Sequence, residues 1–544
     1  MNYRSTMIAR FPGGADALAA ALPRGLSAGT APAPTPRALP APVVSSAGDG
    51  PFFLMVYPSP LLGTGEGANK PWLQELPDPV TKIAWQTVAE LHPSAARRLG
   101  VENGDHVTVE TAGGRLTLPV YVYLGIRPDT IAVSAGRGHS EAAGRYASAG
   151  ENAFDLLPYS EDRSGATLYG FARAKVTKDG GFSRLATTEG SSRQHGRGIG
   201  QAMTVADLAH PETHAESHGE FPGDASHEFL PGLRSPTAND AQGDLGGPEL
   251  ESKEKGMYDP KHWSGMAKHR WAMTIDLARC TGCSACVTAC YAENNIPTVG
   301  ADWQGPRYLP DRTGFGANIT RSREMAWLRL ERYFEGGEDG NPNFDTRFVP
   351  MLCQHCGNAP CEPVCPVYAT YHAPDGLNVQ VYNRCVGTRY CSNNCPYKVR
   401  YFNWFGYGEP ARAQYAFPEP LNWQLNPDVT VRAKGVMEKC TFCVQRIRDA
   451  ENRASLEKRG LEPDEFTTAC AEACPSRAIT FGDAADDRWR VSQLVNDRRA
   501  YHVFEELNTY TAVVYLKKVN HPGPGTPAGA ARSGAANEPQ GAGH

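Results

Sequence analysis

The stretch CTGCSACVTAC, residues 280–290, decides the fold of the second half of this chain, because it sets four cysteines in a C-x2-C-x2-C-x3-C run. Cysteines three residues apart in an irregular loop can wrap one iron–sulfur cluster, with backbone N–H groups directed at its sulfur atoms. The fourth cysteine follows four positions after the third, about one helical turn, so it can point to a different cluster. The run therefore predicts two clusters that share one segment of chain, as in bacterial ferredoxins.

Three further cysteine groups follow this run. The second has C-x2-C-x4-C-x3-C-P spacing, the third has Thr388 where its second cysteine would stand, and the fourth again ends in Cys-Pro. The four groups are Cys280, Cys283, Cys286 and Cys290; Cys353, Cys356, Cys361 and Cys365; Cys385, Cys391 and Cys395; and Cys440, Cys443, Cys470 and Cys474. They account for all fifteen cysteines, and this odd number excludes a complete set of internal disulfides.

The crossed arrangement of duplicated ferredoxins assigns the ligands, if the first group pairs with the fourth and the second with the third. One cluster then takes Cys280, Cys283, Cys286 and Cys474; another takes Cys440, Cys443, Cys470 and Cys290; a third takes Cys353, Cys356, Cys361 and Cys395; and the last has only Cys365, Cys385 and Cys391. A threonine hydroxyl cannot replace a thiolate, so we expect the last cluster to lack its fourth iron. The sequence predicts three [4Fe–4S] clusters and one [3Fe–4S] cluster; the alternative is a fourth cube with a water or hydroxyl ligand.

Other uses of cysteine fit this spacing less well. A tetrahedral zinc site needs two separated cysteine pairs and not a run of three, and zinc would have no use for Thr388. No C-x-x-C-H motif occurs, so we expect no covalent haem. The only metal that we expect is iron, held by the same cysteines. Because the chemistry then belongs to the cofactors, we expect no catalytic side chain.

Basic residues beside the cysteines have two interpretations. Either they offset the charge of the clusters, or they lie on solvated surface. They are Lys398, Arg400, Lys439 and Arg446.

Composition excludes some classes of function. The net charge is −5, so there is no basic excess to hold nucleic acid by counterion release. Mean hydropathy is −0.44, and no apolar run is long enough to span a bilayer. Residues 7–22 are too interrupted by charge and glycine for the core of an export signal.

We predict an α+β chain of two folded regions joined by irregular segments. The predicted parts are a disordered or extended tether (1–50), a β-rich barrel (51–178), an interdomain linker (179–267), a duplicated ferredoxin-like four-cluster domain (268–518) and a disordered tail (519–544). In the barrel, β-like runs cover Lys82–Val88, His106–Glu110, Arg115–Tyr123 and Thr130–Val133, and a helix covers Pro93–Leu99 and ends at Gly100. In the linker, His210, His214 and His218 fall four residues apart, but solvated linker is the better interpretation.

The cysteine-rich half resembles the iron–sulfur electron-transfer subunits of molybdenum oxidoreductases. The similar stretches are CTGCSACVTACYAENN (280–295), CQHCGNAPCEPVCPVYAT (353–370), CSNNCPYKVRYFNW (391–404), EKCTFCVQRI (438–447) and AVVYLKK (512–518). They extend over about 250 residues, and their spacing is highly specific.

The β-rich region carries a second resemblance. The stretches WLQELPDPVTKIAW (72–85), AARRLGVENGDHVTVET (95–111) and GRGHSEAAGRYASAGENAFDLLP (136–158) are similar to the molybdopterin-dinucleotide-binding domain of those enzymes. This resemblance implies a double-psi β-barrel, in which Gly136, Gly138, His139, Gly144 and Asn152 would be the loop contacts. We expect this chain to hold no domain that would supply a molybdenum ligand, and we therefore expect a structural barrel without molybdopterin.

A barrel fused ahead of a four-cluster module resembles the iron–sulfur subunits of alternative complex III, a quinol-oxidising membrane complex. The Thr388 departure matches those subunits too, and the resemblance implies three cubes and one [3Fe–4S] cluster. It also implies partners: an integral membrane quinol-binding subunit, multihaem cytochrome c subunits, and a separate chain for the rest of the molybdopterin-enzyme-like region. The implied location is the periplasmic face of the inner membrane, where partner subunits hold the chain.

Two other functions compete with this one. The first is an electron-transfer subunit of a molybdenum reductase of the polysulfide, dimethyl sulfoxide or nitrate type; molybdenum in the purified assembly would favour it. The second is a zinc-stabilised scaffold, which a brown colour would exclude, because iron–sulfur clusters absorb broadly in the visible range.

Overall fold

The computed structural model describes residues 49–158, 170–188, 190–209, 269–300, 324–336, 344–412 and 415–520. Nearly all of the predicted tether and tail, and all three linker histidines, lie outside these residues. In the part of the chain that is described, no helix combines the length and the apolar character that crossing a bilayer requires.

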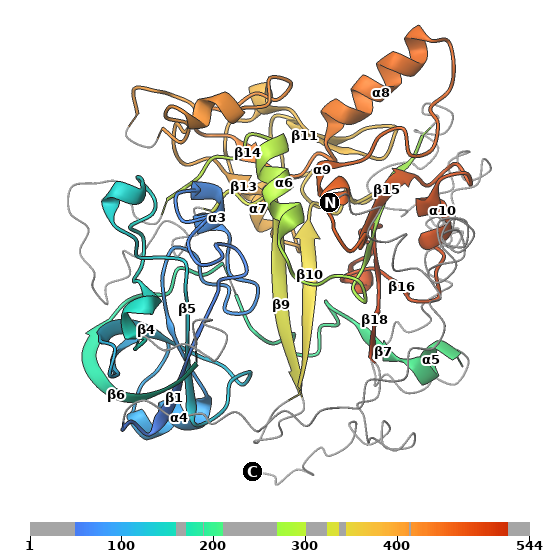
Figure 1. Cartoon of the computed structure of the whole chain (residues 1–544). Helices are drawn as coiled ribbons and strands as arrows, with labels where there is room; N and C mark the ends of the chain where they lie inside the picture. Colours follow the sequence, from blue (N-terminus) through green and yellow to red (C-terminus); the bar gives the residue numbers. More distant parts are fainter. Residues whose placement is uncertain are drawn as a thin grey trace, which may run out of the picture. The chain divides into compact units, whose positions relative to one another are not determined.

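A closed barrel of six strands forms the first folded region (Figure 1). Its strands run in the order β1-β5-β2-β4-β3-β6, and β1–β5 and β2–β4 are the parallel pairs. The strands are β1 (Phe52–Tyr57), β2 (Ala89–Leu91), β3 (Asp105–Glu110), β4 (Arg115–Val122), β5 (Thr130–Ser134) and β6 (Gly170–Phe182). Alternate residues such as Val107 and Val109 are fully buried in the barrel core. The predicted barrel is therefore present, while its double-psi connectivity stays a prediction.

Most of the predicted elements of the barrel are confirmed, and one is wrong. The helix α4 covers Pro93–Leu99 as predicted, and Gly100 ends it with a left-handed φ of 64°. No strand covers Lys82–Val88, because Lys82 and Trp85 have left-handed φ angles of 60° and 64°, which break an extended run. The strand β2 begins directly after this segment.

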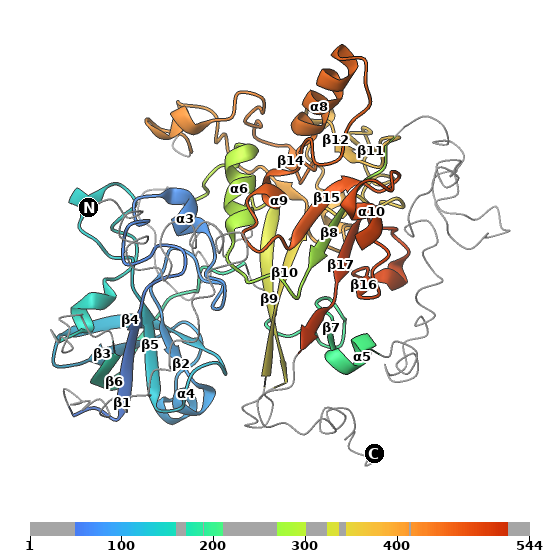
Figure 2. The ribbon, with the colours of Figure 1, turned by 45° about the vertical axis from the view of Figure 1, so that its right-hand side comes forward.

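The cysteine-rich region is built on a four-stranded sheet of order β15-β8-β17-β16, whose strands lie side by side in Figure 2. The strands are β8 (Trp271–Asp276), β15 (Ile479–Asp483), β16 (Ala500–Tyr501) and β17 (Val513–Leu516). All six residues of β8 are buried. This strand leads into the first cysteine group, and β15 follows the fourth, so antiparallel pairing of β8 with β15 brings the two groups together.

Short strands and helices flank the cysteine loops. The strands are β9 (Leu328–Gly336), β10 (Phe344–Leu352), β11 (Thr370–His372), β12 (Asn378–Gln380), β13 (Tyr401–Phe402) and β14 (Met437–Glu438). The α-helices are α6 (Ala285–Glu293), α7 (Tyr390–Asn393), α8 (Val444–Leu456), α9 (Ala469–Glu472) and α10 (Arg490–Leu494). Of these strands and helices, only α6, α7 and α9 themselves contain cysteines. Pairing of β13 with β14 joins the end of the third cysteine group to the start of the fourth.

The first part of the predicted linker belongs to the folded structure, which corrects its boundary. Residues 202–204 form β7, which pairs in parallel with β18 (Lys518–Asn520); the short helix α5 (Val205–Ala209) follows. The Tyr501 hydroxyl donates a hydrogen bond to the carbonyl oxygen of Ile199 at 2.8 Å. The polar composition of the segment does not indicate that it belongs to a folded region. Its backbone nevertheless forms hydrogen bonds with residues about 300 positions away in sequence.

The barrel region and the cysteine-rich region contact each other through α3 (Pro71–Glu75) and β9. The Trp72 indole donates to the carbonyl oxygen of Ile296 at 3.0 Å. The buried Arg332 of β9 donates to the carbonyl oxygen of Val80 at 2.7 Å and to the Tyr121 hydroxyl at 2.8 Å. Direct hydrogen bonds therefore join the two regions.

Candidate iron–sulfur centres

In each of the four groups, the residue before the second ligand position, which is a cysteine in three groups and Thr388 in the third, has a left-handed backbone. These residues are Gly282 (φ 76°), His355 (φ 45°), Gly387 (φ 72°) and Phe442 (φ 54°). A left-handed residue turns the chain sharply, so each loop curls and can direct its cysteines to a common centre. Glycine adopts this conformation without cost, whereas His355 and Phe442 adopt it against their intrinsic preference.

The loop that contains Thr388 has the same backbone as a loop with its full set of cysteines. Gly387 matches Gly282, and Arg389 (φ 63°, ψ 0°) matches Ser284 (φ 62°, ψ 10°). Arg389 and Ser284 each directly precede a helix, α7 and α6 respectively. Thr388 therefore occupies the position that Cys283 has in the first group. The loop keeps the backbone of a cluster-binding loop, although a threonine stands at this ligand position.

The first and fourth cysteine groups lie next to each other. Burial, together with the charges of Cys474 and Cys283, raises the pKa of Cys280 to about 11. Burial also raises the pKa of the Cys290 thiol, and the charges of Cys440 and Cys443 raise it further. The neighbours are those of the predicted crossed pairing, in which Cys474 joins the first group and Cys290 joins the fourth.

The second and third groups are neighbours in the same way. Burial and the charges of Cys353, Cys395 and Cys361 raise the pKa of Cys356. A small cavity beside them is lined by Cys365, Cys385, Cys391 and Thr388. The structure thus gathers the three cysteines predicted for the incomplete cluster around Thr388. The four ligand sets themselves stay predictions.

Hydrogen bonds to sulfur indicate that these sites fit iron–sulfur clusters. The backbone N–H of Ala369 donates to Cys365 Sγ at 3.1 Å, and that of Ala478 donates to Cys474 Sγ at 3.2 Å. Burial alone would raise the pKa of Cys365, but the backbone N–H groups of Val367, Ala369 and Thr370 outweigh it and lower the pKa below its usual value. Backbone N–H groups directed at cysteine sulfur atoms are typical of iron–sulfur sites. Within the described ranges, no group of three or more His, Cys, Asp or Glu side chains is arranged to hold a single metal ion.

The four basic residues near the cysteines have different environments. Arg400 and Lys439 are buried, with exposed fractions of 3% and 0%. Lys398 is exposed, and Arg446 is half-buried in ion pairs with Glu293 and Glu472. The interpretation as solvated surface is therefore wrong for Arg400 and Lys439.

A stacked aromatic pair joins two cysteine loops, a feature that sequence reasoning missed. The His355 ring lies between Cys353 and Cys356 in sequence and stacks on the Phe442 ring, with centroids 3.9 Å apart. Phe442 lies between Cys440 and Cys443. The pair brings the second group against the fourth, and the charge of Cys353 contributes to raising the pKa of Cys440, after burial and the nearer cysteines.

The glycines of the barrel loop at residues 136–152 face protein atoms. A Cβ on Gly138 would lie 2.1 Å from the backbone nitrogen of Asn152, and one on Gly144 would lie 2.2 Å from the Asn69 side chain. The Asn152 side chain accepts a hydrogen bond from the N–H of Phe154 at 3.2 Å. The loop that would contact a pterin in the resembled enzymes is thus packed on its own chain. That no molybdopterin is bound stays a prediction.

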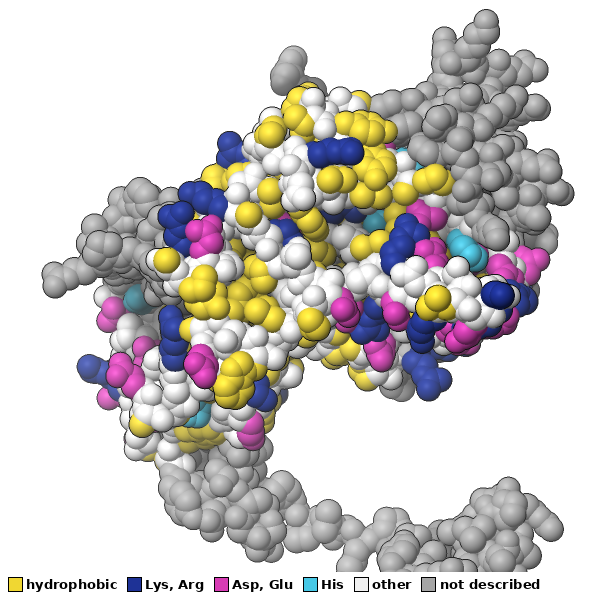
Figure 3. Space-filling view, turned by 90° about the horizontal axis from the view of Figure 1, so that it is seen from above, with side chains coloured by type: hydrophobic (Ala, Val, Ile, Leu, Met, Phe, Trp, Pro, Cys, Tyr) yellow, Lys and Arg dark blue, Asp and Glu magenta, His cyan; other side chains and the backbone are white. Residues whose placement is uncertain are grey.

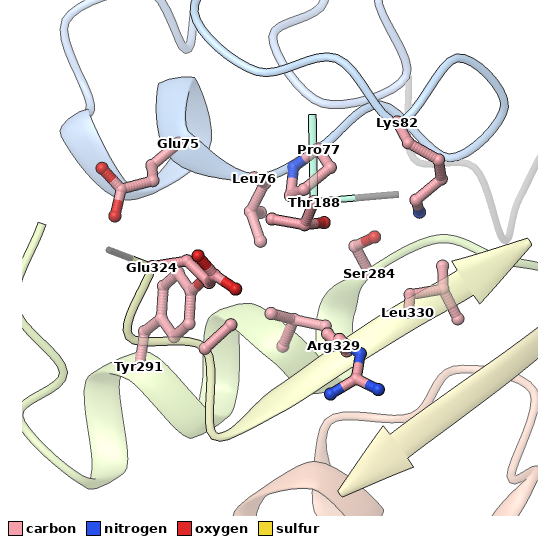
Figure 4. A pocket seen from close by; sticks show the side chains of 12 residues that line it. Glu75, Leu76, Pro77, Lys82, Thr188, Ser284, Tyr291, Glu324, Arg329 and Leu330 are labelled. Atoms are coloured by element: carbon pink, nitrogen blue, oxygen red, sulfur yellow. The ribbon is translucent and has the colours of Figure 1, made fainter. Parts of the chain in front are cut away.

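A small cavity lies at the contact between the two regions, and Figure 4 shows its lining. Glu75 of α3 is 5% exposed there and accepts hydrogen bonds from the backbone N–H groups of Val299 (2.9 Å) and Gly300 (2.8 Å). Burial raises the pKa of Glu75 to about 7, since these hydrogen bonds offset it only in part and the charge of Glu324 adds to it. Tyr291 lines the same cavity one residue after Cys290.

Known protein families match both the barrel region and the cysteine-rich region. Residues 72–164 match the molybdopterin dinucleotide binding domain family. Residues 279–369 and 344–408 match two families that are each described as a 4Fe-4S dicluster domain. The iron–sulfur cluster-binding subunit of menaquinone reductase from Nitratidesulfovibrio vulgaris is 40% identical over 255 residues, which cover 46% of this chain and 90% of that protein.

The chain belongs to the family of iron–sulfur subunits of molybdopterin oxidoreductase-type complexes. Another relative, iron–sulfur subunit 1 of the Hdr-like menaquinol oxidoreductase from Archaeoglobus fulgidus, is 31% identical over 287 residues, covering 50% of this chain and 91% of that protein. The iron–sulfur subunit of arsenate respiratory reductase from a Shewanella species is 30% identical over 268 residues, covering 46% of this chain and 96% of that protein. Acetylene hydratase from Pelobacter acetylenicus matches 24% of this chain and 18% of that chain at 23% identity, with a TM-score of 0.19.

Membership of the iron–sulfur subunit family confirms the predicted general role. The chain is an electron-transfer subunit with iron–sulfur clusters, and its two folded regions are a molybdopterin-dinucleotide-binding domain and two dicluster domains.

Proposed function

We propose that this chain is the electron-transfer subunit of a quinol-oxidising complex of the alternative complex III type, with three [4Fe–4S] clusters and one [3Fe–4S] cluster. The observation that carries this proposal is the loop from Cys385 to Cys391, which keeps a cluster-binding backbone but has Thr388 at a ligand position. The barrel fused ahead of the cysteine groups supports it, because molybdenum reductases keep that barrel on their catalytic chain.

The chain's own residues would bind and insulate the clusters. The ligands would be the four sets given by the crossed pairing, and backbone N–H groups such as that of Ala369 would stabilise the cluster charge. When bound, such clusters take up and release single electrons at potentials set by charge, hydrogen bonds and exposure. Most of the fifteen cysteines are buried, which keeps water away from the clusters.

The three-cysteine site is the one at which we expect a membrane partner to dock. Large apolar side chains are exposed beside it: Tyr368 by 54%, Val386 by 65% and Tyr390 by 56%. Exposed apolar groups near one site are typical of an interaction surface. Figure 3 shows that apolar side chains also gather on the face that is seen from above in Figure 1.

The proposed partners follow from this assignment. They are an integral membrane quinol-binding subunit, multihaem cytochrome c subunits, and a chain with the rest of the molybdopterin-enzyme-like region. The proposed location is the periplasmic face of the inner membrane. Two relatives named for menaquinone or menaquinol support the link to a quinone.

Electron paramagnetic resonance of the oxidised, anaerobically purified complex tests the proposal. We expect a single [3Fe–4S] signal in the wild type and in a Thr388→Ser control. In Thr388→Cys this signal should disappear, with one more iron per chain and a fourth cube on reduction. A wild type with four cubes and no [3Fe–4S] signal would refute the assignment of Thr388.

A second candidate function is the electron-transfer subunit of a molybdenum reductase. The similarity to the iron–sulfur subunit of arsenate respiratory reductase favours it. Molybdenum in the purified complex would support this candidate. Multihaem cytochromes together with no molybdenum would support the first.

A further inference from the structure

Arg400 is a buried cation with an unusual set of partners. Its Nη1 donates to Cys361 Sγ at 3.4 Å and to the side-chain oxygen of Asn378 at 3.1 Å, and its Nη2 donates to the side-chain oxygen of Gln380. Asn378 and Gln380 are alternate residues of β12, so their side chains lie on one face of the strand. The guanidinium is thereby fixed between neutral oxygens and a cysteine sulfur.

The backbone of Arg400 is also fixed between two cysteine groups. It precedes β13, whose pairing with β14 is two residues from Cys440. The Arg400 carbonyl oxygen accepts a hydrogen bond from the Ser392 hydroxyl, one residue after Cys391, at 2.8 Å. Rotation of the side chain away from the sulfur atoms is therefore restricted from both ends.

No carboxylate in the described part of the chain forms an ion pair with Arg400. A buried charge is costly unless opposite charge compensates it. Burial alone lowers the pKa of Arg400, but the charges of Cys361, Cys391, Cys353 and Cys395 outweigh it and raise the pKa above its usual value. The compensating charge of this arginine is thus the sulfur of the candidate ligands.

The influence of Arg400 extends to two of the predicted ligand sets. Its hydrogen bond to Cys361 Sγ places it against the predicted ligand set of a complete cube. Its side chain also forms a hydrogen bond with that of Cys391, which belongs to the three-cysteine set, although burial keeps the pKa of Cys391 above its usual value. One guanidinium therefore stabilises negative charge at two neighbouring sites.

We propose that Arg400 sets the reduction potentials of both the [3Fe–4S] cluster and the neighbouring cube, raising the two together. The proposal rests on the proposed ligand sets. Reduction adds one negative charge to a cluster, and a fixed cation beside it favours the reduced state. Because the cation lies between both sites, it keeps the two potentials high in parallel, which favours transfer between them.

Redox titration of the intact complex, followed by electron paramagnetic resonance, tests this proposal. In Arg400→Gln, the reduction equilibrium of both clusters should become about tenfold less favourable, which is 59 mV downward for a one-electron couple. In Arg400→Lys, which keeps the charge, both shifts should be smaller. The reduction potentials of the two cubes that the first and fourth groups hold should shift less than those of the [3Fe–4S] cluster and its neighbouring cube.

A second variant leaves the arginine in place. Gln380→Glu is isosteric and neutralises the guanidinium, so it should lower both potentials as Arg400→Gln does, even if the latter fails to assemble. Arg332→Gln is the matched control, because Arg332 is 1% exposed and bonds to Val80 and Tyr121 instead of a cysteine. In Arg332→Gln, the reduction potentials of both clusters should equal those of the wild type.

The outcomes separate this proposal from the function on which it rests. If the clusters are present in Gln380→Glu and neither potential moves, the role of Arg400 is refuted while the electron-transfer function stands. A shift at only one of the two clusters would refute the shared role. If the wild type has no [3Fe–4S] cluster, the ligand assignment itself fails.

Discussion

Glu75 should make the contact between the two regions weaker as the pH rises. Its carboxyl is buried and holds the backbone N–H groups of Val299 and Gly300. Its pKa is about 7 in the folded protein, against 4.5 when it is exposed. The folded state therefore binds this proton more tightly than the unfolded state, and stability is lost as the pH rises from 4.5 through 7.

The two pKa values fix the size of the effect. Between pH 6 and pH 8 the folded protein releases the Glu75 proton, whereas the exposed carboxyl is already ionised throughout. The contribution to stability falls by about 1.3 kcal/mol over this range, which is about tenfold in the equilibrium for opening. In Glu75→Gln, which cannot ionise, this dependence should be absent.

Hydrogen exchange of the segment that contains Val299 and Gly300 measures this opening. Wild type and Glu75→Gln are compared at each pH, so that the intrinsic pH dependence of exchange cancels. We expect the wild type to lose protection relative to the variant by about tenfold from pH 6 to pH 8. Glu102→Gln, a change at an exposed carboxylate of the barrel, should behave as the wild type. A constant ratio between wild type and Glu75→Gln across this range would show that Glu75 does not titrate there.

Two further predictions concern stability, measured as the urea midpoint of tryptophan fluorescence. Gly138→Ala should destabilise the barrel more than Gly180→Ala. Both glycines have a left-handed backbone, so alanine should cost about 1–3 kcal/mol of strain at either position, but only a Cβ on residue 138 would also collide with a backbone atom. Equal urea midpoints for the two variants would contradict this. Glu438→Gln should cost about 3–5 kcal/mol, since it leaves Arg432 buried without its ion-pair partner at 2.9 Å. The exposed Asp129→Asn should cost no more than about 1 kcal/mol, and a similar loss in both would refute the buried-pair argument.

Features that depend on neighbouring residues in the chain could be predicted from the sequence. The spacing of the cysteines indicated loops around iron–sulfur clusters, and the four loops have the sharp left-handed turns that such loops need. Helix α4 has its bounds because proline begins it and glycine ends it. The alternation of apolar residues indicated β3, β4 and β5. Each signal acts over a few residues, so it is complete in the sequence itself.

Only the tertiary structure decided which charged side chains are buried. Nothing near Arg400 in sequence distinguishes it from the exposed Lys398, yet β12 covers the first and leaves the second in solvent. Glu75 likewise meets its partners, Val299 and Gly300, from more than 200 residues away. Burial depends on which distant segments pack over a side chain. The sequence therefore predicts the ligands through the spacing of the cysteines, while tertiary packing decides which charged side chains lie beside them.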